Sequence, residues 1–277
     1  MELPGGRTLA WSEWGPAGGT PVLLCPGAAT SRALGFATEA LPELGVRLVS
    51  ADRPGLGASD PDPGRTLLGW AADARELVPG GAVAVGFSQG APFALACAAA
   101  GAVEAVAIVA GSDELSHPAF ETRLDPQLRG LVELARDDPA GAEAAFSSFT
   151  ADGLWEMVVD TSSELDRELY TEPAFERAYR RALAEGFAQG PAGYARDTAL
   201  AMAPWPFALE DLDVPVDLWY GRHDASAVHS PDLGATLERR IPGARRRVLP
   251  DAGGGILWTH GAEILAELLR TAARHPR

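Results

Sequence analysis

A five-residue pattern constrains this chain more than any other feature of its sequence. Residues 86–90 read Gly-Phe-Ser-Gln-Gly, and they lie between the apolar run Val83 to Val85 and a small-residue segment that begins by Ala91. The run is typical of a buried strand and the segment of a helix, so the pattern occupies a strand-to-helix turn. Glycine at both ends lets the strand and the helix approach closely. A serine at the centre of such a turn sits on a strained bend that exposes its hydroxyl.

Two roles are open to Ser88 at this turn. Its hydroxyl can act as a nucleophile above the sheet, or it can cap the following helix in an ordinary strand–helix connection. The five-residue pattern alone does not separate these roles, because G-x-S-x-G also arises by chance. The rest of the chain favours the first role.

Composition limits the partners that the chain can have. Its 277 residues, of which 47% are hydrophobic, suffice for one large domain or for a core with an insertion. The formal net charge is −15 and the chain has no lysine. Such a chain repels phosphate backbones and anionic membrane surfaces. The charge therefore argues against nucleic acid and a membrane as partners, and it leaves a small-molecule substrate as the candidate.

The cysteines and the amino terminus bear on cellular location. Cys25 and Cys97 lie in apolar segments and predict buried free thiols in a reducing compartment. Residues 1–7 lack the apolar core of a secretory signal, and no apolar run approaches the roughly 18 residues of a membrane span. No metal-ligand spacing occurs, and we expect no cofactor. These features predict a soluble, cytoplasmic protein.

Strands and helices alternate in both outer parts of the chain. The expected strands are residues 9–14, 21–25, 46–51, 83–85, 103–109, 214–220 and 245–249, and the expected helices are residues 34–44, 67–77, 91–100 and 232–240 and a terminal helix that carries Ile264 to Ala272. This alternation predicts a parallel sheet that is covered on both faces. The loops after Cys25, Ala51 and Val85 would then meet at the carboxyl edge of the sheet.

The middle of the chain has a different texture. Residues 113–206 contain no convincing strand, and their clearest helix carries Phe175, Tyr179 and Leu183 on one apolar face. We predict that residues 113–206 form a helical cap, inserted into a core made of residues 1–112 and 207–277. Most aromatic side chains of the cap would pack in its own small core, and a minority would face a ligand.

With these landmarks in order, the chain resembles the α/β-hydrolase superfamily, in particular its capped esterase, lactonase and haloperoxidase-like members. The resemblance depends on residues 86–90, on residues 52–59 (similar to the family's D-x-x-G-x-G-x-S), on residues 221–224 and on the inserted helices. It covers nearly the whole chain. It implies a mostly parallel eight-stranded sheet with helices on both faces and a helical cap. Serine at position 88 argues against the related dehalogenases and epoxide hydrolases, which use an aspartate nucleophile.

The resemblance also implies roles for individual residues. Ser88 would be the nucleophile, and Asp224 would orient the catalytic base, although a simple turn aspartate is the alternative. The backbone N–H groups of Ala28 and Gln89 would form the oxyanion hole. The family usually has His-Gly in the loop after the strand that ends at Cys25, where this chain has Pro26-Gly27, and this change still permits Ala28 to donate.

The base is where the chain departs from the family. The family's loop after its last strand reads Gly-His, whereas Gly253 is followed here by Gly254. Among the five histidines, we favour His260 as the base, because three successive glycines let this loop take a different path. The other candidates are His117, His223, His275 and His229, the last of which we expect at the surface. The alternative is that His260 merely caps a helix and that Ser88 is not activated.

Two functions follow from these residues. The first is a serine hydrolase that cleaves a carboxylic ester, lactone or thioester of a small apolar molecule through an acyl-enzyme on Ser88, with an acyltransferase as a lesser variant. The second is a non-catalytic or weakly active small-molecule-binding protein on the same fold, motivated by Gly254.

Overall fold

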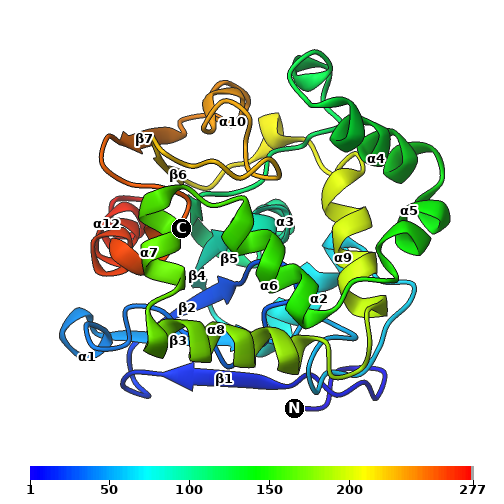
Figure 1. Cartoon of the computed structure of the whole chain (residues 1–277). Coiled ribbons are helices and arrows are strands. Elements are labelled where there is room, and N and C mark those ends of the chain that lie inside the picture. Colours follow the sequence, from blue (N-terminus) through cyan, green and yellow to red (C-terminus); the bar gives the residue numbers. More distant parts are fainter. Residues whose placement is uncertain (276–277) are drawn as a thin grey trace.

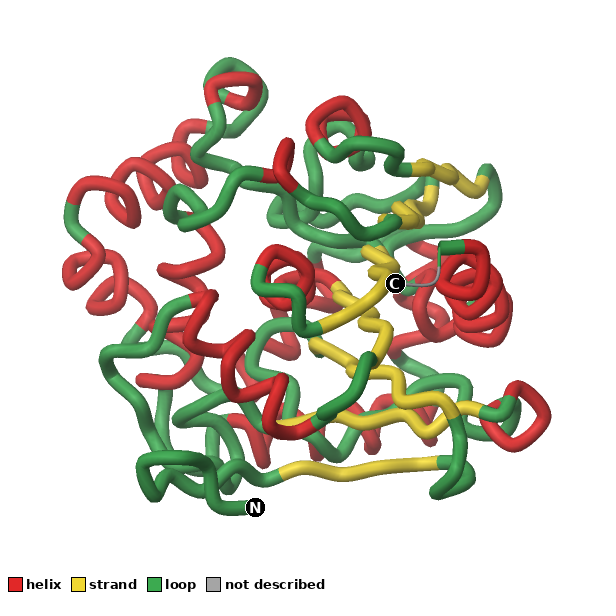
Figure 2. The backbone as a smooth tube through the Cα atoms, turned by 180° about the vertical axis from the view of Figure 1, so that it is seen from behind, coloured by secondary structure: helices red, strands yellow, loops and turns green. Residues whose placement is uncertain are grey.

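The computed structural model describes residues 1–275. A twisted sheet of seven strands in the order β1-β3-β2-β4-β5-β6-β7 crosses the molecule, with helices on both sides (Figures 1 and 2). The strands are β1 (Trp11–Trp14), β2 (Thr20–Cys25), β3 (Val46–Ala51), β4 (Ala82–Phe87), β5 (Val103–Val109), β6 (Val216–Gly221) and β7 (Arg245–Leu249). Only β1 runs antiparallel to its neighbour. The mostly parallel α/β architecture expected from the sequence is confirmed.

The sheet has one strand fewer than the eight expected. Within the described residues, the segment before β1 adds only an isolated bridge between Glu2 and Thr8. The chain turns at residues 4–6, directly after the first member of this pair. No ladder extends from the bridge, so β1 remains the edge of the sheet.

Two layers of helices cover the sheet. On one face lie α2 (Leu67–Leu77), α3 (Ala91–Ala99) and α10 (Ala235–Arg240), and on the other lie α1 (Leu41–Leu44), α11 (Ile256–Thr259) and α12 (Gly261–Arg274). The central strand β4 is buried along its whole length, as the apolar run predicts for a parallel strand. In α12, Ile264, Leu265 and Leu268 are buried. Burial of each such side chain contributes roughly 1.5–3 kcal/mol to the stability of the fold.

The chain between β5 and β6 forms helices and no strand. These are α4 (Pro126–Asp137), α5 (Pro139–Phe146), α6 (Ala151–Asp160), α7 (Glu164–Tyr170), α8 (Pro173–Gly186) and α9 (Ala192–Met202). In Figure 1, α6, α7 and α8 pass in front of the strands. The helices share an apolar cluster of their own. Prolines begin three of them, each after an acidic residue that caps the helix: Asp125-Pro126, Asp138-Pro139 and Glu172-Pro173.

One expected helix is mostly absent. Residues 34–44 were expected to be helical, but only Leu41–Leu44 form α1. Ala37 has φ = 49°, a left-handed conformation that interrupts a helix. Just before it, the Arg32 backbone N–H donates to the Asp52 carboxylate at 2.6 Å, which fixes this segment against the loop after β3. Among the described residues, no helix is both long enough and apolar enough to cross a lipid bilayer.

Candidate active site

Ser88 lies where β4 passes into the helix that follows. It has φ = 51° and begins the 3-10 helix η1 (Ser88–Gly90), which continues into α3. A non-glycine residue with a left-handed backbone conformation carries about 1–3 kcal/mol of strain, and packing of the surrounding structure must offset this strain. Gly86 and Gly90, on either side of Ser88, lie where the turn packs too closely for a larger residue. A Cβ atom on Gly86 would lie 2.8 Å from the Cβ of Ala94, and one on Gly90 would overlap the carbonyl oxygen of Cys25.

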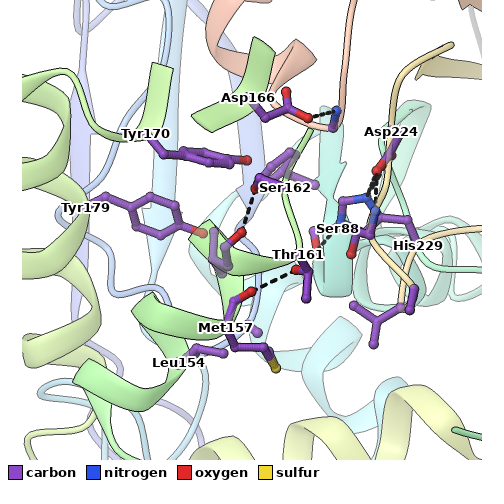
Figure 3. Close-up of a pocket in the computed structure, with 17 residues that line it drawn as sticks. Ser88, Leu154, Met157, Thr161, Ser162, Asp166, Tyr170, Tyr179, Asp224 and His229 are labelled. Atoms are coloured by element: carbon purple, nitrogen blue, oxygen red, sulfur yellow. Dashed lines mark hydrogen bonds and ion pairs between the residues drawn. The ribbon is translucent and has the colours of Figure 1, made fainter. Parts of the chain in front are cut away.

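Three polar side chains meet above this turn, as Figure 3 shows. The Nε2 atom of His229 lies 2.8 Å from Oγ of Ser88. Its Nδ1 atom lies 2.8 Å from Oδ2 and 3.0 Å from Oδ1 of Asp224. The side chains of His229 and Asp224 are 9% and 2% exposed. With its proton on Nδ1, the imidazole donates to the carboxylate and can accept the serine proton on Nε2.

A short loop after β6 carries both the acid and the imidazole. The Asp224 carboxylate accepts the backbone N–H of Ser226 at 3.1 Å, a local bond that bends the chain. The backbone N–H of His229 donates to the carbonyl of Ser226 at 3.3 Å, and that of Ser230 donates to the carbonyl of Gly111 at 3.0 Å. These bonds turn the loop back toward the sheet and place His229 beside Ser88.

The three side chains open into a cavity of about 150 Å³. It is lined from the core side by Ala28, Phe87, Gly254 and the loop residues 226–228. The opposite wall comes from α6, α7, α8 and the turn between α6 and α7. The wall is mainly apolar, with Leu154 and Met157 contributed by α6. A cavity of this kind, apolar with a few converging polar groups, is typical of a small-molecule site.

Two tyrosines add hydroxyl groups to the wall. Burial raises the pKa of Tyr179 to about 12 and raises the pKa of Tyr170 well above its ordinary value. At neutral pH both phenols carry their proton, so each hydroxyl group is a hydrogen-bond donor. Among residues 1–275, no group of three or more histidine, cysteine or acidic side chains has the arrangement of a metal site.

A carboxylate from α7 binds the triple-glycine loop. Asp166 is buried, and its oxygens accept the backbone N–H groups of Gly254 at 2.8 Å and Gly255 at 2.7 Å. It also accepts the hydroxyl of Ser163 at 2.8 Å. A Cβ atom on Gly254 would lie 2.8 Å from Oδ1 of Asp224. The loop thus passes between two carboxylates, where side chains have no room.

The sequence itself places the chain in a known family. A model described as the alpha/beta hydrolase family matches residues 22–267. The chain belongs to this family. No curated protein sequence gives a significant match.

Solved structures of this family resemble the chain along nearly its whole length. A thermophilic esterase from Thermogutta terrifontis is 23% identical, with a TM-score of 0.69, and the match covers 99% of this chain and 96% of that one. A bromoperoxidase from Bacillus anthracis is 20% identical, with a TM-score of 0.70, and the match covers 97% of this chain and 96% of that one. An enol-lactonase from Burkholderia xenovorans LB400 is 20% identical, with a TM-score of 0.68, and the match covers 96% of this chain and 97% of that one. At these identities the likeness shows the shared alpha/beta hydrolase fold.

The structure brings Ser88 and Asp224 together, but it does not bring His260 to them. The loop that follows β7 is held by Asp166, and after it the short helix α11 buries Ile256 and Leu257. His260 then lies between α11 and α12, where its Nδ1 atom is 2.8 Å from Oγ1 of the adjacent Thr259. The loop therefore leaves His260 in contact with Thr259, and His260 does not line the cavity that contains Ser88.

Three other histidines are also placed away from Ser88. His117 caps a short 3-10 helix by accepting the backbone N–H of Ala119 at 3.2 Å. His223 is exposed, and His275 contacts the carbonyl of Thr271 at 3.1 Å. His229, expected at the surface, is instead buried beside the serine.

Ala28 and Gln89, the two residues expected to form the oxyanion hole, both belong to the surroundings of Ser88. Ala28 lines the cavity together with Ser88. Gln89 follows Ser88 directly, and its side-chain Nε2 donates to Oγ1 of Thr198 in α9 at 2.9 Å. The Gln89 side chain therefore contacts the inserted helices, and its backbone stays at the turn.

Sequence reasoning considered His229 but expected it at the surface, and it did not single out Asp166. One signal for His229 was available, because it follows Asp224 by five residues and so keeps the chain order serine, acid, histidine of the alpha/beta hydrolases. For Asp166, the pattern Ser163-x-x-Asp166 indicates a helix start. Nothing in that pattern predicts the contact with Gly254, which lies 88 positions later in the sequence.

Proposed function

We propose that this chain is a serine hydrolase that cleaves a carboxylic ester, lactone or thioester of a small apolar molecule through an acyl-enzyme on Ser88. The observation that carries this proposal is the position of His229, with Nε2 2.8 Å from the serine hydroxyl and Nδ1 2.8 Å from the Asp224 carboxylate. Such an arrangement supplies the base that a serine hydroxyl requires before it can attack a carbonyl group.

The proposed reaction has two halves. In the first, Oγ of Ser88 attacks the carbonyl carbon while Nε2 of His229 takes its proton, and the backbone N–H groups of Ala28 and Gln89 bind the developing oxyanion. The imidazolium then gives this proton to the leaving group, and the acyl-enzyme remains. In the second half, His229 takes a proton from water, the hydroxide attacks the acyl group, and Ser88 regains its proton. Asp224 holds the imidazole and stabilises its charged form.

The cavity supports the proposed substrate class. Its volume of about 150 Å³ and its apolar wall, including Leu154 and Val158, suit a small apolar acyl group. The helices that supply this wall would act as the cap over the core, so the division into a cap of residues 113–206 and a core of the remaining residues belongs to the proposal. A cytoplasmic location also remains a prediction from the free cysteines.

The binding-protein alternative rested on Gly254, at the position where the family's histidine was expected. His229 offers an imidazole from another loop, so that position no longer argues against catalysis. The alternative is an outcome of the following experiment, and so is transfer of the acyl group to an acceptor other than water.

Turnover of p-nitrophenyl acetate, butyrate and octanoate tests the proposal. The parent chain should be active, with a preference for the short esters, and Ser88→Ala and His229→Ala should each lower kcat by about 10²–10⁴-fold. His260→Ala is the matched control, because it removes an imidazole that does not contact the serine, and it should keep parental activity.

A fluorophosphonate probe gives a second readout, since it should label Ser88 in the parent and not in Ser88→Ala. A parent that neither turns over these esters nor accepts the probe would favour the binding protein. Loss of activity in His260→Ala, with activity retained in His229→Ala, would overturn the assignment of the base.

A further inference from the structure

A fully buried arginine contacts the loop that carries Ala28. Arg53 follows β3 by two residues, and its side chain is 0% exposed. Its Nη1 atom donates to the carbonyl of Pro26 at 2.8 Å, and its Nη2 atom donates to the carbonyl of Gly27 at 3.1 Å. The two arms of one guanidinium therefore bind two successive carbonyl groups just before Ala28.

These contacts orient a peptide group, whose carbonyl at Gly27 also accepts the backbone N–H of Thr30 at 3.4 Å. The carbonyl of Gly27 and the N–H of Ala28 belong to one trans peptide, in which the two bonds point in opposite directions. A donor that holds the carbonyl from the interior of the protein therefore turns the N–H away from the interior. Because Ala28 lines the cavity beside Ser88, an N–H turned away from Arg53 would be on the side where substrate binds.

The charge of Arg53 is balanced from an inserted helix. Its Nε atom donates to Oδ2 of Asp197 in α9 at 2.6 Å, and Nη2 of Arg65 donates to Oδ1 of the same carboxylate at 2.6 Å. The guanidinium carbon of Arg53 also lies 4.5 Å from the centre of the Phe93 ring. The ion pair with Asp197 and the contact with the ring offset the cost of removing this cation from water. Arg65 shares Asp197 but does not contact the carbonyls of Pro26 and Gly27, so the two arginines separate the ion pair from the loop contacts.

We propose that Arg53 is a positioning residue of the oxyanion hole, which sets the orientation of the Ala28 N–H by binding the two preceding carbonyl groups. This inference rests on the proposed function, because the N–H has a chemical task only if Ser88 attacks a carbonyl. Arg53 does not touch the substrate, since it lies fully buried behind the loop.

Two matched variants test the proposal. Arg53→Met removes both carbonyl contacts and leaves Asp197 paired with Arg65, whereas Arg65→Met removes one ion-pair partner and leaves both carbonyl contacts. Loss of one oxyanion donor lowers kcat by about 10²–10³-fold in other enzymes. We expect a fall of that order for Arg53→Met with KM changed less than about threefold, and parental kcat for Arg65→Met.

An inhibitor distinguishes this role from a general loss of stability. A trifluoromethyl ketone forms a tetrahedral oxyanion with the serine, and its affinity should fall in Arg53→Met by about the same factor as kcat. Affinity for the product acid should change far less. Arg53→Lys keeps the charge but lacks the two-armed donor, so it should show an intermediate loss; it also serves if Arg53→Met fails to fold. Parental kcat and parental inhibitor affinity in the Arg53 variants, or equal losses in Arg65→Met, would overturn the proposal.

Crystal structures of the same variants give a readout that does not depend on activity. The peptide between Gly27 and Ala28 should rotate or lose its fixed orientation in Arg53→Met and should stay in place in Arg65→Met. If the parent is inactive but the peptide still moves, the proposed function fails and the positioning contact stands. If the parent is active and the peptide does not move, the function stands and the role of Arg53 is rejected.

Discussion

His229 lies 2.8 Å from Ser88 although the two residues are 141 positions apart, and it reaches the serine from the same loop that carries Asp224. The acid and the base are separated by only five positions. Their mutual geometry is therefore set by one short segment, which the bond from the Ser226 N–H to the Asp224 carboxylate bends. This arrangement leads to predictions about the acid, the glycine loop and a nearby buried carboxyl group.

Asp224→Asn should impair catalysis without unfolding the chain. The amide would present a donor or a neutral acceptor to Nδ1, so the imidazole would lose the interaction that fixes its tautomer and stabilises its charge. We expect kcat for p-nitrophenyl acetate to fall by about 10²–10⁴-fold. Asp251→Asn, an exposed change in the loop after β7, serves as control. Parental activity in Asp224→Asn would show that His229 works without this carboxylate.

Gly254→His should lower activity, although it places a histidine at the position where the resemblance to the family leads us to expect one. The new Cβ atom would lie 2.8 Å from Oδ1 of Asp224 and displace that carboxylate from His229. We expect kcat/KM to fall by roughly 10²-fold or more, the scale of losing acid–base catalysis. Gly18→His is the matched control, because nothing lies within 4 Å of a Cβ atom there. Recovery of activity in the double variant Gly254→His with His229→Ala would contradict this reading of the loop.

Asp166→Ala should destabilise the chain. The substitution leaves the N–H groups of Gly254 and Gly255 without their acceptor, and hydrogen bonds to a charged group contribute about 1.5–3 kcal/mol each. We expect the free energy of unfolding, measured with urea, to fall by about 2–4 kcal/mol. Asp152→Ala removes a carboxylate whose side chain is 84% exposed, and it should cost less than about 1 kcal/mol. Equal losses in the two variants would show that the bonds to the glycine loop contribute little.

The pH dependence of stability should carry the signature of Asp113. Burial raises the pKa of this carboxyl group from 3.8 to about 7, and the nearby Asp232 raises the pKa further, whereas bonds from the Glu114 N–H and the Ser230 hydroxyl oppose the rise. Between these two pKa values the folded state holds a proton that the unfolded state has released. The stability contributed by Asp113 is thus complete below pH 4 and is lost as pH rises to 7, by about 1.4 kcal/mol per unit.

Asp113→Asn tests this sign. The amide cannot ionise, so the stability of the variant relative to the parent should increase as pH rises from 4 to 7 and should then level off. Urea unfolding at unit steps from pH 4 to pH 8 measures the difference, and Asp152→Asn controls for the loss of one surface charge. A difference between variant and parent that does not change with pH would rule out a raised pKa for Asp113.

Local features made part of the site predictable from the sequence. The turn at Ser88 follows from residues 86–90, because two glycines between a buried strand and a helix leave few backbone paths. The expectation for Asp224 came from the resemblance to the α/β-hydrolases, which have an acid just after the corresponding strand. The structure brings the side chains of Ser88 and Asp224 to the same cavity.

The identity of the imidazole was not predictable in the same way. Three glycines permit many backbone paths but select none of them, and the path taken after β7 depends on Asp166, which comes from a distant helix. The approach of His229 likewise depends on a bond between the Ser230 N–H and the Gly111 carbonyl, which joins two loops far apart in the sequence. Non-local contacts of this kind leave no periodic pattern. The bond from the Arg32 N–H to Asp52 is likewise non-local, and it lies just before the segment where an expected helix is mostly absent.

The loop that carries both Asp224 and His229 has a consequence for thermal motion. A displacement of this segment moves the acid and the base together, so it alters their separation from the serine while preserving their separation from each other. Where the two groups come from independent loops, two uncorrelated fluctuations would add. Here one short segment sets how often all three side chains are aligned.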